Sequence, residues 1–236
     1  MERPTIAGWQ CRVCGASVDI ATPFTWKCPN ASVTDRYHAL RLVQGVAPLQ
    51  SGGQSNPFLA FRPHLAWNAF VAAHGLTVVA REAMVRELDS LVASVAGTGF
   101  VATPCERSNE LSDALGFAAQ GGVWVKDETH NVAGSHKARH LFTILLHLRA
   151  AEQLGLAQWL QRPPLAIASC GNAALAAATL ATAVSWPIRV FVPPSANLYV
   201  TKRLAELGAT VIECPRILSD PAGDPCVHRF REAVAA

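Results

Sequence analysis

Three short apolar runs in the second half of the chain alternate with segments of helical periodicity, and this alternation constrains the fold most. The runs lie at residues 165–169, 188–192 and 210–214. An alanine-rich segment separates the first two, and residues 197–207, closed by Gly208, separate the last two. The alternation predicts an α/β fold in which crossover helices join the strands of a parallel sheet. Strands covered by helices on both faces are expected to be apolar throughout, as these runs are.

A second informative segment lies at residues 123–140. An apolar run at 123–125 predicts a buried strand, and Gly134 and Ser135 provide turn and N-cap chemistry. From Lys137 the apolar residues recur at helical spacing until Gly155, so Lys137 is expected in the first turn of a helix. An amine beside unpaired N–H groups and the positive end of the helix dipole is disfavoured as ammonium, which suits imine chemistry with a carbonyl cofactor. A solvated surface lysine is the alternative interpretation of this residue taken alone.

Seven residues at fixed spacing in this segment carry a family resemblance. Their pattern resembles the Schiff-base segment of fold type II pyridoxal-phosphate (PLP) enzymes, and the residues are Lys126, Glu128, Asn131, Gly134, Ser135, Lys137 and Arg139. The family includes threonine synthase, threonine dehydratase, cysteine synthase and the tryptophan synthase β chain. The resemblance implies that Lys137 holds PLP as an internal aldimine.

The loop after the first of the three apolar runs supports this resemblance. Its sequence, Ser169-Cys170-Gly171-Asn172, resembles the S-x-G-N loop of the same family. The resemblance implies that Asn172 contacts the 3′ oxygen of the cofactor, and that Ser169, Cys170 and Gly171 receive the substrate carboxylate at a helix N-terminus. The family more often has Ser or Thr in place of Cys170, and a thiol is a weaker hydrogen-bond donor. An ordinary N-cap is the alternative explanation of Gly171 and Asn172.

The resemblance extends from Thr103-Pro104 to about Pro215 and implies a PLP-dependent amino-acid lyase. The expected reaction is a β- or γ-elimination or replacement on a hydroxy amino acid or its phosphate, as in threonine synthase and threonine dehydratase. An amino acid would displace Lys137 from the cofactor, and the freed amine would be the general base for the Cα proton. A cysteine-synthase-like β-replacement and a non-catalytic, truncated remnant are the two alternatives.

The glycine-rich loop that holds the PLP phosphate lies well C-terminal to the S-x-G-N loop in this family. No such loop follows Asn172 in the sequence, and Gly52-Gly53 and Gly121-Gly122 both precede Lys137. We therefore expect residues 101–236 to be the N-terminal part of the PLP-binding α/β catalytic region, truncated at its C-terminus.

Three of the seven cysteines lie near the start of the chain. Cys11-x-x-Cys14 matches half of a zinc ribbon and Cys28 resembles the second half, which predicts a zinc site with Cys11, Cys14 and Cys28 as ligands. A structural zinc site needs four ligands. No fourth cysteine stands at the expected position, and His38 offers a ligand at an unusual spacing. A degenerate ribbon that folds without metal is the alternative.

The chain divides into three expected segments. Residues 1–40 form a Cys-rich, ribbon-like segment, residues 41–100 a linker and packing helices, and residues 101–236 the catalytic region. The helices are expected at 64–74 and 81–96, where apolar residues form a stripe on one side.

Composition excludes several classes of partner. Of the 236 residues half are apolar and 16% are charged, which indicates a globular chain. The net charge is only +3 and the basic residues are scattered, so we expect no nucleic-acid partner. Neither a signal peptide nor a membrane span is visible, which predicts a cytoplasmic protein with no membrane partner. The expected partner is a small amino-acid substrate, and the family resemblance is compatible with a homodimer.

Overall fold

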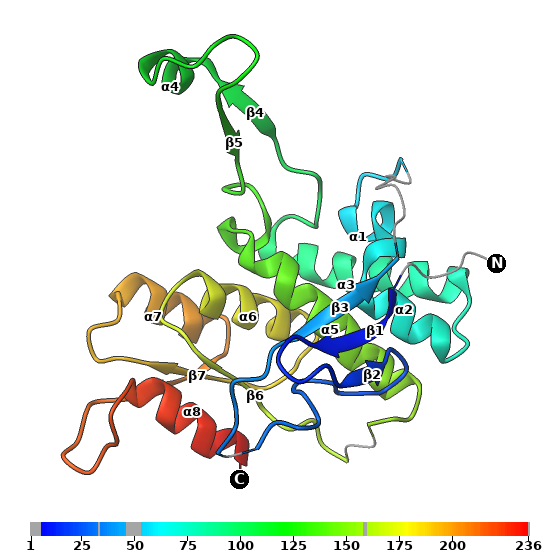
Figure 1. Ribbon diagram of the computed structural model, residues 1–236. Coiled ribbons are helices and arrows are strands. Elements are labelled where there is room, and N and C mark those ends of the chain that lie inside the picture. The colour runs from blue at the N-terminus through cyan, green and yellow to red at the C-terminus, as the bar shows by residue number, and fades with distance from the viewer. Residues whose placement is uncertain (1–5, 33, 46–52, 158–159, 236) are drawn as a thin grey trace. The chain divides into compact units, whose positions relative to one another are not determined.

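The chain folds into two compact units. The computed structural model describes residues 6–32, 34–45, 53–157 and 160–235 (Figure 1). Unit 1 comprises Met1–Leu88 and Phe142–Leu160, and unit 2 comprises Asp89–Leu141 and Gln161–Ala236. Two helices, α3 (Val78–Ala96) and α5 (Lys137–Gln153), contribute residues to both units.

Unit 1 begins with a small antiparallel sheet in the order β2-β1-β3. Its strands are β1 (Ile6–Cys11), β2 (Ser17–Asp19) and β3 (Leu40–Gln44), and Trp9 of β1 pairs with a residue of each neighbour. Because β2 has only three residues, the sheet makes few ladder hydrogen bonds and depends on other contacts for its stability. This sheet, with Cys11 at the end of β1, is the Cys-rich, ribbon-like segment expected at the start of the chain.

Helices supply the core of unit 1. They are α1 (Pro57–Ala60), the 3-10 helix η1 (Arg62–His64), α2 (Ala66–Ala73), and the parts of α3 and α5 that belong to this unit. The rings of Phe58 and Phe142 lie 4.7 Å apart, and both side chains are buried, as are Phe70 and Val85. The helices predicted at 64–74 and 81–96 correspond to α2 and α3, which confirms the helical periodicity of this region.

Unit 2 contains the parallel sheet that the alternating pattern predicts. Its strands are β6 (Leu165–Ala168), β7 (Ile188–Val192) and β8 (Thr210–Glu213), in that order. Helices α6 (Asn172–Ala183) and α7 (Leu198–Glu206) lie on one face, and α8 (Pro225–Ala235) covers the other (Figure 1). Phe191 of β7 packs with Cys226 and Phe230 of α8. The α/β class with crossover helices is confirmed.

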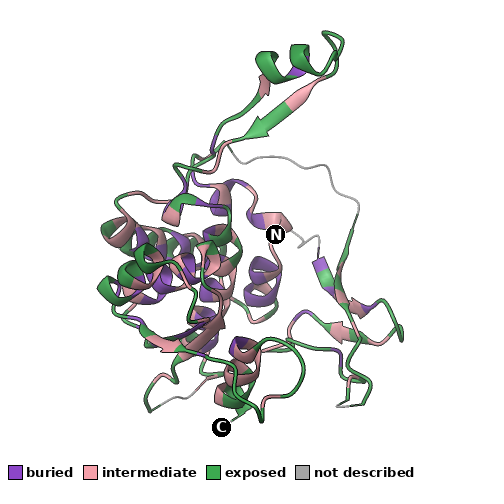
Figure 2. Cartoon of the chain, turned by 90° about the vertical axis from the view of Figure 1, so that its left-hand side faces the viewer, coloured by how far each residue is buried: buried purple, intermediate pink, exposed green. Residues whose placement is uncertain are grey.

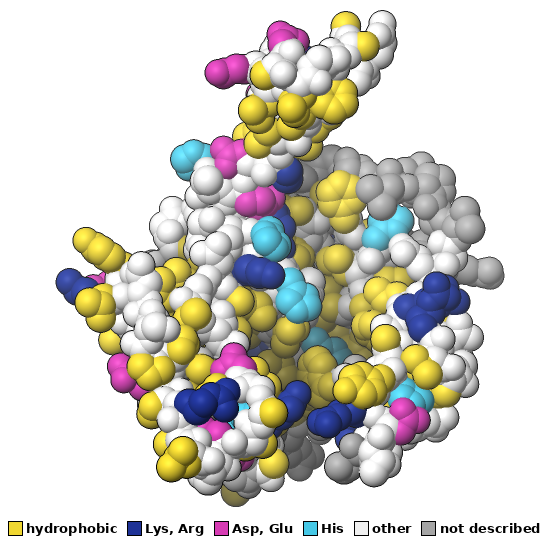
Figure 3. Space-filling model, turned by 60° about the vertical axis from the view of Figure 1, so that its left-hand side comes forward, with side chains coloured by type: hydrophobic (Ala, Val, Ile, Leu, Met, Phe, Trp, Pro, Cys, Tyr) yellow, Lys and Arg dark blue, Asp and Glu magenta, His cyan; other side chains and the backbone are white. Residues whose placement is uncertain are grey.

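A two-stranded arm also belongs to unit 2. Strands β4 (Cys105–Ser108) and β5 (Val123–Lys126) pair antiparallel and are joined through the short helix α4 (Asn109–Ala114). The arm is largely exposed, and hydrophobic side chains gather on its surface (Figures 2 and 3). A strand at 123–125 was expected and is present, but the prediction that it is buried was wrong, since Trp124 is 64% exposed. Its neighbour is the short strand β4 and not a strand of the covered parallel sheet.

No helix in the described part of the chain is both long and apolar enough to cross a membrane.

Candidate active site and Cys/His cluster

Lys137 is the first residue of α5, as the sequence predicts. A loop and the 3-10 helix η2 (Val132–Gly134) connect it to the end of β5. The N–H of Lys137 donates to the Oγ of Ser135 at 3.3 Å, so Ser135 satisfies one of the unpaired amides at this helix start. The Lys137 side chain is exposed, which leaves its amine open to a ligand.

Asn131 holds the backbone of this loop in place. Its side chain is buried, and its Nδ2 donates to the backbone oxygen of Ser135 at 2.8 Å. Between these two residues the chain turns through positive φ at Ala133 (55°) and Gly134 (65°). Glycine adopts this conformation at little cost, whereas an alanine there needs support from its surroundings. The Asn131 hydrogen bond spans this turn and provides such support.

Three polar side chains join the loop to the first turn of α5. Glu128 accepts hydrogen bonds from the Oγ1 of Thr103 at 2.6 Å and from the Nε of Arg139 at 2.9 Å. Arg139 also donates to the backbone oxygen of Val101 at 3.0 Å. The sequence marks these three residues only as positions that match the family, and their mutual contacts are seen only in the structure. The available signal was the presence of oppositely charged residues, Glu128 and Arg139, on both sides of the turn.

The environment of Glu128 keeps its carboxylate charged. Partial burial raises its pKa, but the hydrogen bonds from Arg139 and Thr103 and the charges of Arg139 and Lys126 outweigh this effect. The net result is a pKa below the ordinary value for glutamate. Glu128 therefore remains an anion that fixes Arg139, two residues after Lys137.

The loop at 169–172 lies between β6 and α6. Asn172 is the first residue of α6, Gly171 is its N-cap, and no side chain among the described residues caps this helix start. Cys170 and Asn172 are exposed, and Ser169 and Gly171 are half-buried. The N–H of Ser169 donates to the oxygen of Phe191, which ties the start of the loop to the sheet. The amides at the start of α6 are thus available to an anion.

The segment that precedes Lys137 and helix α6 are neighbours in unit 2. Helix η2, which directly precedes Lys137, contacts α6, which starts at Asn172. The structure therefore brings η2, which ends at Gly134, into contact with a helix that starts only at Asn172.

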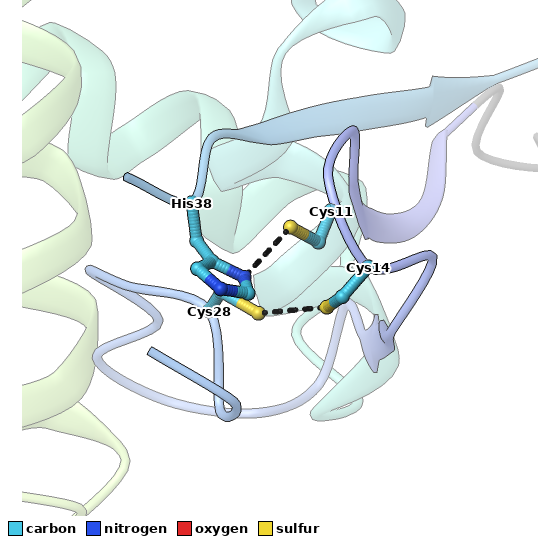
Figure 4. A group of neighbouring side chains, drawn as sticks. All are labelled: Cys11, Cys14, Cys28 and His38. Atoms are coloured by element: carbon cyan, nitrogen blue, oxygen red, sulfur yellow. Dashed lines mark hydrogen bonds between the residues drawn. The ribbon is translucent and has the colours of Figure 1, made fainter. Parts of the chain in front are cut away.

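The candidate metal ligands lie in unit 1. Cys11 ends β1, Cys14 lies on the turn that follows, and Cys28 lies on the loop that leads toward β3 (Figure 4). His38, the open alternative for the fourth ligand, lies in the same cluster, and the ligand atoms of all four residues are within 4.8 Å of one another. We call these four residues the Cys/His cluster.

The pKa values of the titratable groups in the Cys/His cluster are shifted in different directions. The backbone N–H of Cys14 is the main cause that lowers the pKa of Cys11 to about 6. Hydrogen bonding to Asp35 raises the pKa of His38 to about 9, and burial raises the pKa of Cys28.

Comparison with known proteins identifies the family. The profile of the pyridoxal-phosphate dependent enzymes matches residues 96–236, more than half of the chain. The chain therefore belongs to the family of pyridoxal-phosphate dependent enzymes, of fold type II, as the residues around Lys137 and Asn172 indicate. A search of curated proteins found no match.

Solved structures similar to this chain include three enzymes. Maize serine racemase is 18% identical with a TM-score of 0.42, and the match covers 65% of this chain and 40% of that protein. Threonine deaminase isoform 2 from Solanum lycopersicum is 18% identical with a TM-score of 0.43, covering 68% and 41%. A pyridoxal 5'-phosphate-dependent aspartate racemase is 20% identical with a TM-score of 0.47, covering 64% and 42%. The chain matches well under half the length of each of these proteins.

Proposed function

We propose that this chain carries the cofactor-binding lysine, Lys137, of a PLP-dependent amino-acid lyase. The proposed reaction eliminates or replaces a β or γ substituent of a hydroxy amino acid or its phosphate. The observation that carries the proposal is the contact between η2 and α6, because it holds the Lys137 segment beside the helix that starts at Asn172. The family match supports the cofactor, and the reaction is proposed from the resemblance to threonine synthase and threonine dehydratase.

The residues at this place fit PLP. The exposed Lys137 can reach a carbonyl carbon from the start of α5, and the exposed Asn172 offers an amide to a ring oxygen. Apart from its two chain neighbours, a Cβ added at Gly171 would meet no atom of the described residues within 4 Å. The fold itself therefore leaves open space beside this glycine, which a ligand close to the backbone can occupy.

PLP, when bound, supplies an electron sink for negative charge at the Cα of an amino acid. Once the amino acid has displaced Lys137 from the cofactor, the freed neutral amine would take the Cα proton as the general base. The N–H groups at the start of α6 bind the substrate carboxylate, with Ser169 and Cys170 beside them. Glu128 and Arg139 hold the first turn of α5, and with it Lys137, in a fixed direction.

Reductive trapping tests the cofactor assignment. The purified chain is mixed with PLP, the visible absorption band of the lysine adduct is recorded, and the adduct is reduced with borohydride and mapped by mass spectrometry. We expect the label on Lys137, and its loss in Lys137→Ala but not in the control Lys202→Ala, which removes an exposed lysine of α7. Label distributed over surface lysines, or label that Lys137→Ala leaves unchanged, would overturn the assignment.

A substrate panel separates the proposed lyase from its alternatives. Threonine and a phosphorylated hydroxy amino acid are offered to the PLP-loaded chain, and release of a 2-oxo acid or of phosphate is measured. Turnover that depends on Lys137 supports the lyase. Turnover only of an activated serine with a thiol nucleophile supports the cysteine-synthase-like alternative, and labelling without turnover of any substrate supports the non-catalytic remnant.

A further inference from the structure

In the Cys/His cluster two separations between ligand atoms are close to those of a tetrahedral metal site. The Sγ of Cys14 lies 3.6 Å from the Sγ of Cys28, and the Sγ of Cys11 lies 3.4 Å from the Nδ1 of His38 (Figure 4). With zinc–sulfur bonds of about 2.3 Å and zinc–nitrogen bonds of about 2.0–2.1 Å, a tetrahedron places two sulfurs about 3.8 Å apart and a sulfur and a nitrogen about 3.6 Å apart. The observed separations are about 0.2 Å shorter than these values. The other four separations are at most 4.8 Å, so the four ligand atoms are close enough together to bind one ion.

Backbone amides point at the sulfurs. The N–H of Val13 donates to the Sγ of Cys11, and the N–H of Asn30 donates to the Sγ of Cys28, each at 3.4 Å. In both cases the donor lies two residues after the cysteine, so the same tight turn occurs twice. N–H donors stabilise thiolates, and three thiolates this close together repel one another unless a cation lies between them. The arrangement therefore fits a metal better than three neutral thiols.

His38 is oriented for metal binding by its second nitrogen. Its Nε2 lies 3.1 Å from a carboxylate oxygen of Asp35, so the Nε2–H donates there and Nδ1 is the nitrogen that faces the sulfurs. The His38 side chain is only 3% exposed, whereas Asp35 is 68% exposed. A carboxylate that fixes the tautomer of a ligating histidine is the usual second partner of such a ligand.

A disulfide does not account for the cluster. The Cys14 and Cys28 sulfurs are 3.6 Å apart, well beyond the S–S bond length of about 2.05 Å. Such a bond would also leave Cys11 and His38 unexplained, although both side chains are turned toward the same point (Figure 4).

We infer that Cys11, Cys14, Cys28 and His38 bind one structural zinc ion that holds the β1-β2-β3 sheet together. Three sulfurs and one nitrogen in a tetrahedron are the donor set of structural zinc sites, and four protein ligands leave no position for water or substrate. The ion joins Cys11, at the end of β1, to His38, which lies just before β3. It provides the stabilisation that a sheet with a three-residue strand does not supply by itself.

Metal analysis of the purified full chain tests the site directly. The chain is prepared under reducing conditions, and we expect about one equivalent of zinc per chain. Replacing zinc by Co²⁺ should produce the intense visible bands of a tetrahedral ion and the near-ultraviolet charge-transfer band of bound thiolates. A reduced chain that contains no metal and shows no such bands on addition of Co²⁺ overturns the inference.

Variants assign the ligands. Cys28→Ser and His38→Ala should reduce the bound zinc to near zero, whereas His38→Cys, which restores a fourth ligand, should keep it. The matched control Cys105→Ser removes an exposed cysteine of β4 and should leave the metal content unchanged. Equal zinc in Cys28→Ser and in the control would contradict the assignment.

Thiol protection in the wild-type chain covers the case in which a ligand variant does not fold. Alkylation before and after removal of the metal by a chelator is mapped by mass spectrometry. We expect Cys11, Cys14 and Cys28 to become reactive only after the chelator, while the reactivity of Cys105 and Cys170 does not change. Unchanged reactivity of all three, or a Cys14–Cys28 disulfide found in the reduced preparation, overturns the inference.

Discussion

Replacing Glu128 by glutamine tests whether the loop before Lys137 is held by charge. The carboxylate is 15% exposed and accepts from Arg139, whose side chain is 23% exposed, at 2.9 Å. Glutamine keeps an oxygen for Thr103, but it presents an NH₂ group where Arg139 also donates. The substitution therefore removes one charge-assisted hydrogen bond, with a net contribution of about 1.5–3 kcal/mol, and leaves a partly buried guanidinium without its anion.

We expect Glu128→Gln to lower the free energy of unfolding by about 2–3 kcal/mol. This is less than the roughly 3–5 kcal/mol for breaking a fully buried ion pair, because both partners reach solvent. Lys126 adds little, since it lies 3.8 Å from Glu128 and is 47% exposed. Urea unfolding followed by circular dichroism should show a lower midpoint with an unchanged slope.

The effect of Glu128→Gln on stability should depend on pH. Because the pKa of folded Glu128 lies below its ordinary value of 4.5, its carboxylate contributes stability above that value and loses it as the pH falls through the folded pKa. The difference in stability between wild type and Glu128→Gln should therefore be largest near neutral pH and shrink below about pH 4.5. Reductive labelling of Lys137 by PLP should also fall, if Arg139 positions the start of α5.

A matched control is Glu232→Gln in α8. Glu232 is 67% exposed, and its carboxylate lies 3.5 Å from Arg229. We expect a change below about 0.5 kcal/mol there. An equally small change for Glu128→Gln, or a difference that does not depend on pH, would refute the role assigned to Glu128.

Three further predictions concern stability. Phe142→Ala removes a fully buried ring that lies 4.7 Å from Phe58 and should cost about 3–5 kcal/mol in urea unfolding, so a cost below 1 kcal/mol would contradict the core described for unit 1. Burial and the charge of His74 lower the pKa of His147 below 6.5, so protonation of His147 destabilises the folded chain. The melting temperature of the wild type should therefore fall as the pH is lowered from about 7.5 to 5.5, and that of His147→Gln should fall less. Melting temperatures of the two proteins that change equally with pH would contradict this. Gly134→Ala should lower the free energy of unfolding by about 1–2 kcal/mol, because φ is 65° there. Gly171→Ala, at negative φ and in open space, should leave the free energy of unfolding unchanged but reduce labelling by PLP.

The parallel sheet and its helices could be predicted because their pattern is local. Each strand of the β6-β7-β8 sheet is one apolar run, and each helix between them ends at a residue that the sequence marks, such as Gly208. Helix α5 likewise extends from Lys137 almost to Gly155. Hydrophobic periodicity and stop residues contain this information without reference to the rest of the chain.

The exposed arm could not be predicted in the same way. An apolar run such as Val123–Val125 has the same sequence whether its partner is a covered strand or an exposed one. Its actual partner, β4, lies about 15 residues upstream and is itself mostly exposed. Pairing between distant segments depends on tertiary contacts, which override local preference for strands.

The residues of the two candidate sites also differ in how far the sequence predicts them. Lys137 and Asn172 could be proposed as cofactor-binding residues because their motifs are contiguous, whereas His38 lies 10 residues after Cys28 and outside the spacing of a common zinc ribbon. Only the fold of the loop between β2 and β3 brings its Nδ1 to the sulfurs. In the same way, Thr103 and Glu128 are 25 residues apart, and their hydrogen bond follows from the chain's return along the arm.

Burial distinguishes what the two sites are able to do. In the Cys/His cluster, Cys11, Cys28 and His38 are almost completely shielded from solvent, Cys14 is exposed, and backbone N–H groups donate to the sulfurs of Cys11 and Cys28. Four protein ligands around one ion leave no position for a substrate. At the start of α5 and α6 the opposite holds, since Lys137 and Asn172 are exposed and the amides of α6 have no side-chain cap among the described residues. A reaction on an amino acid needs such an open place, which supports assigning stability to the first site and chemistry to the second.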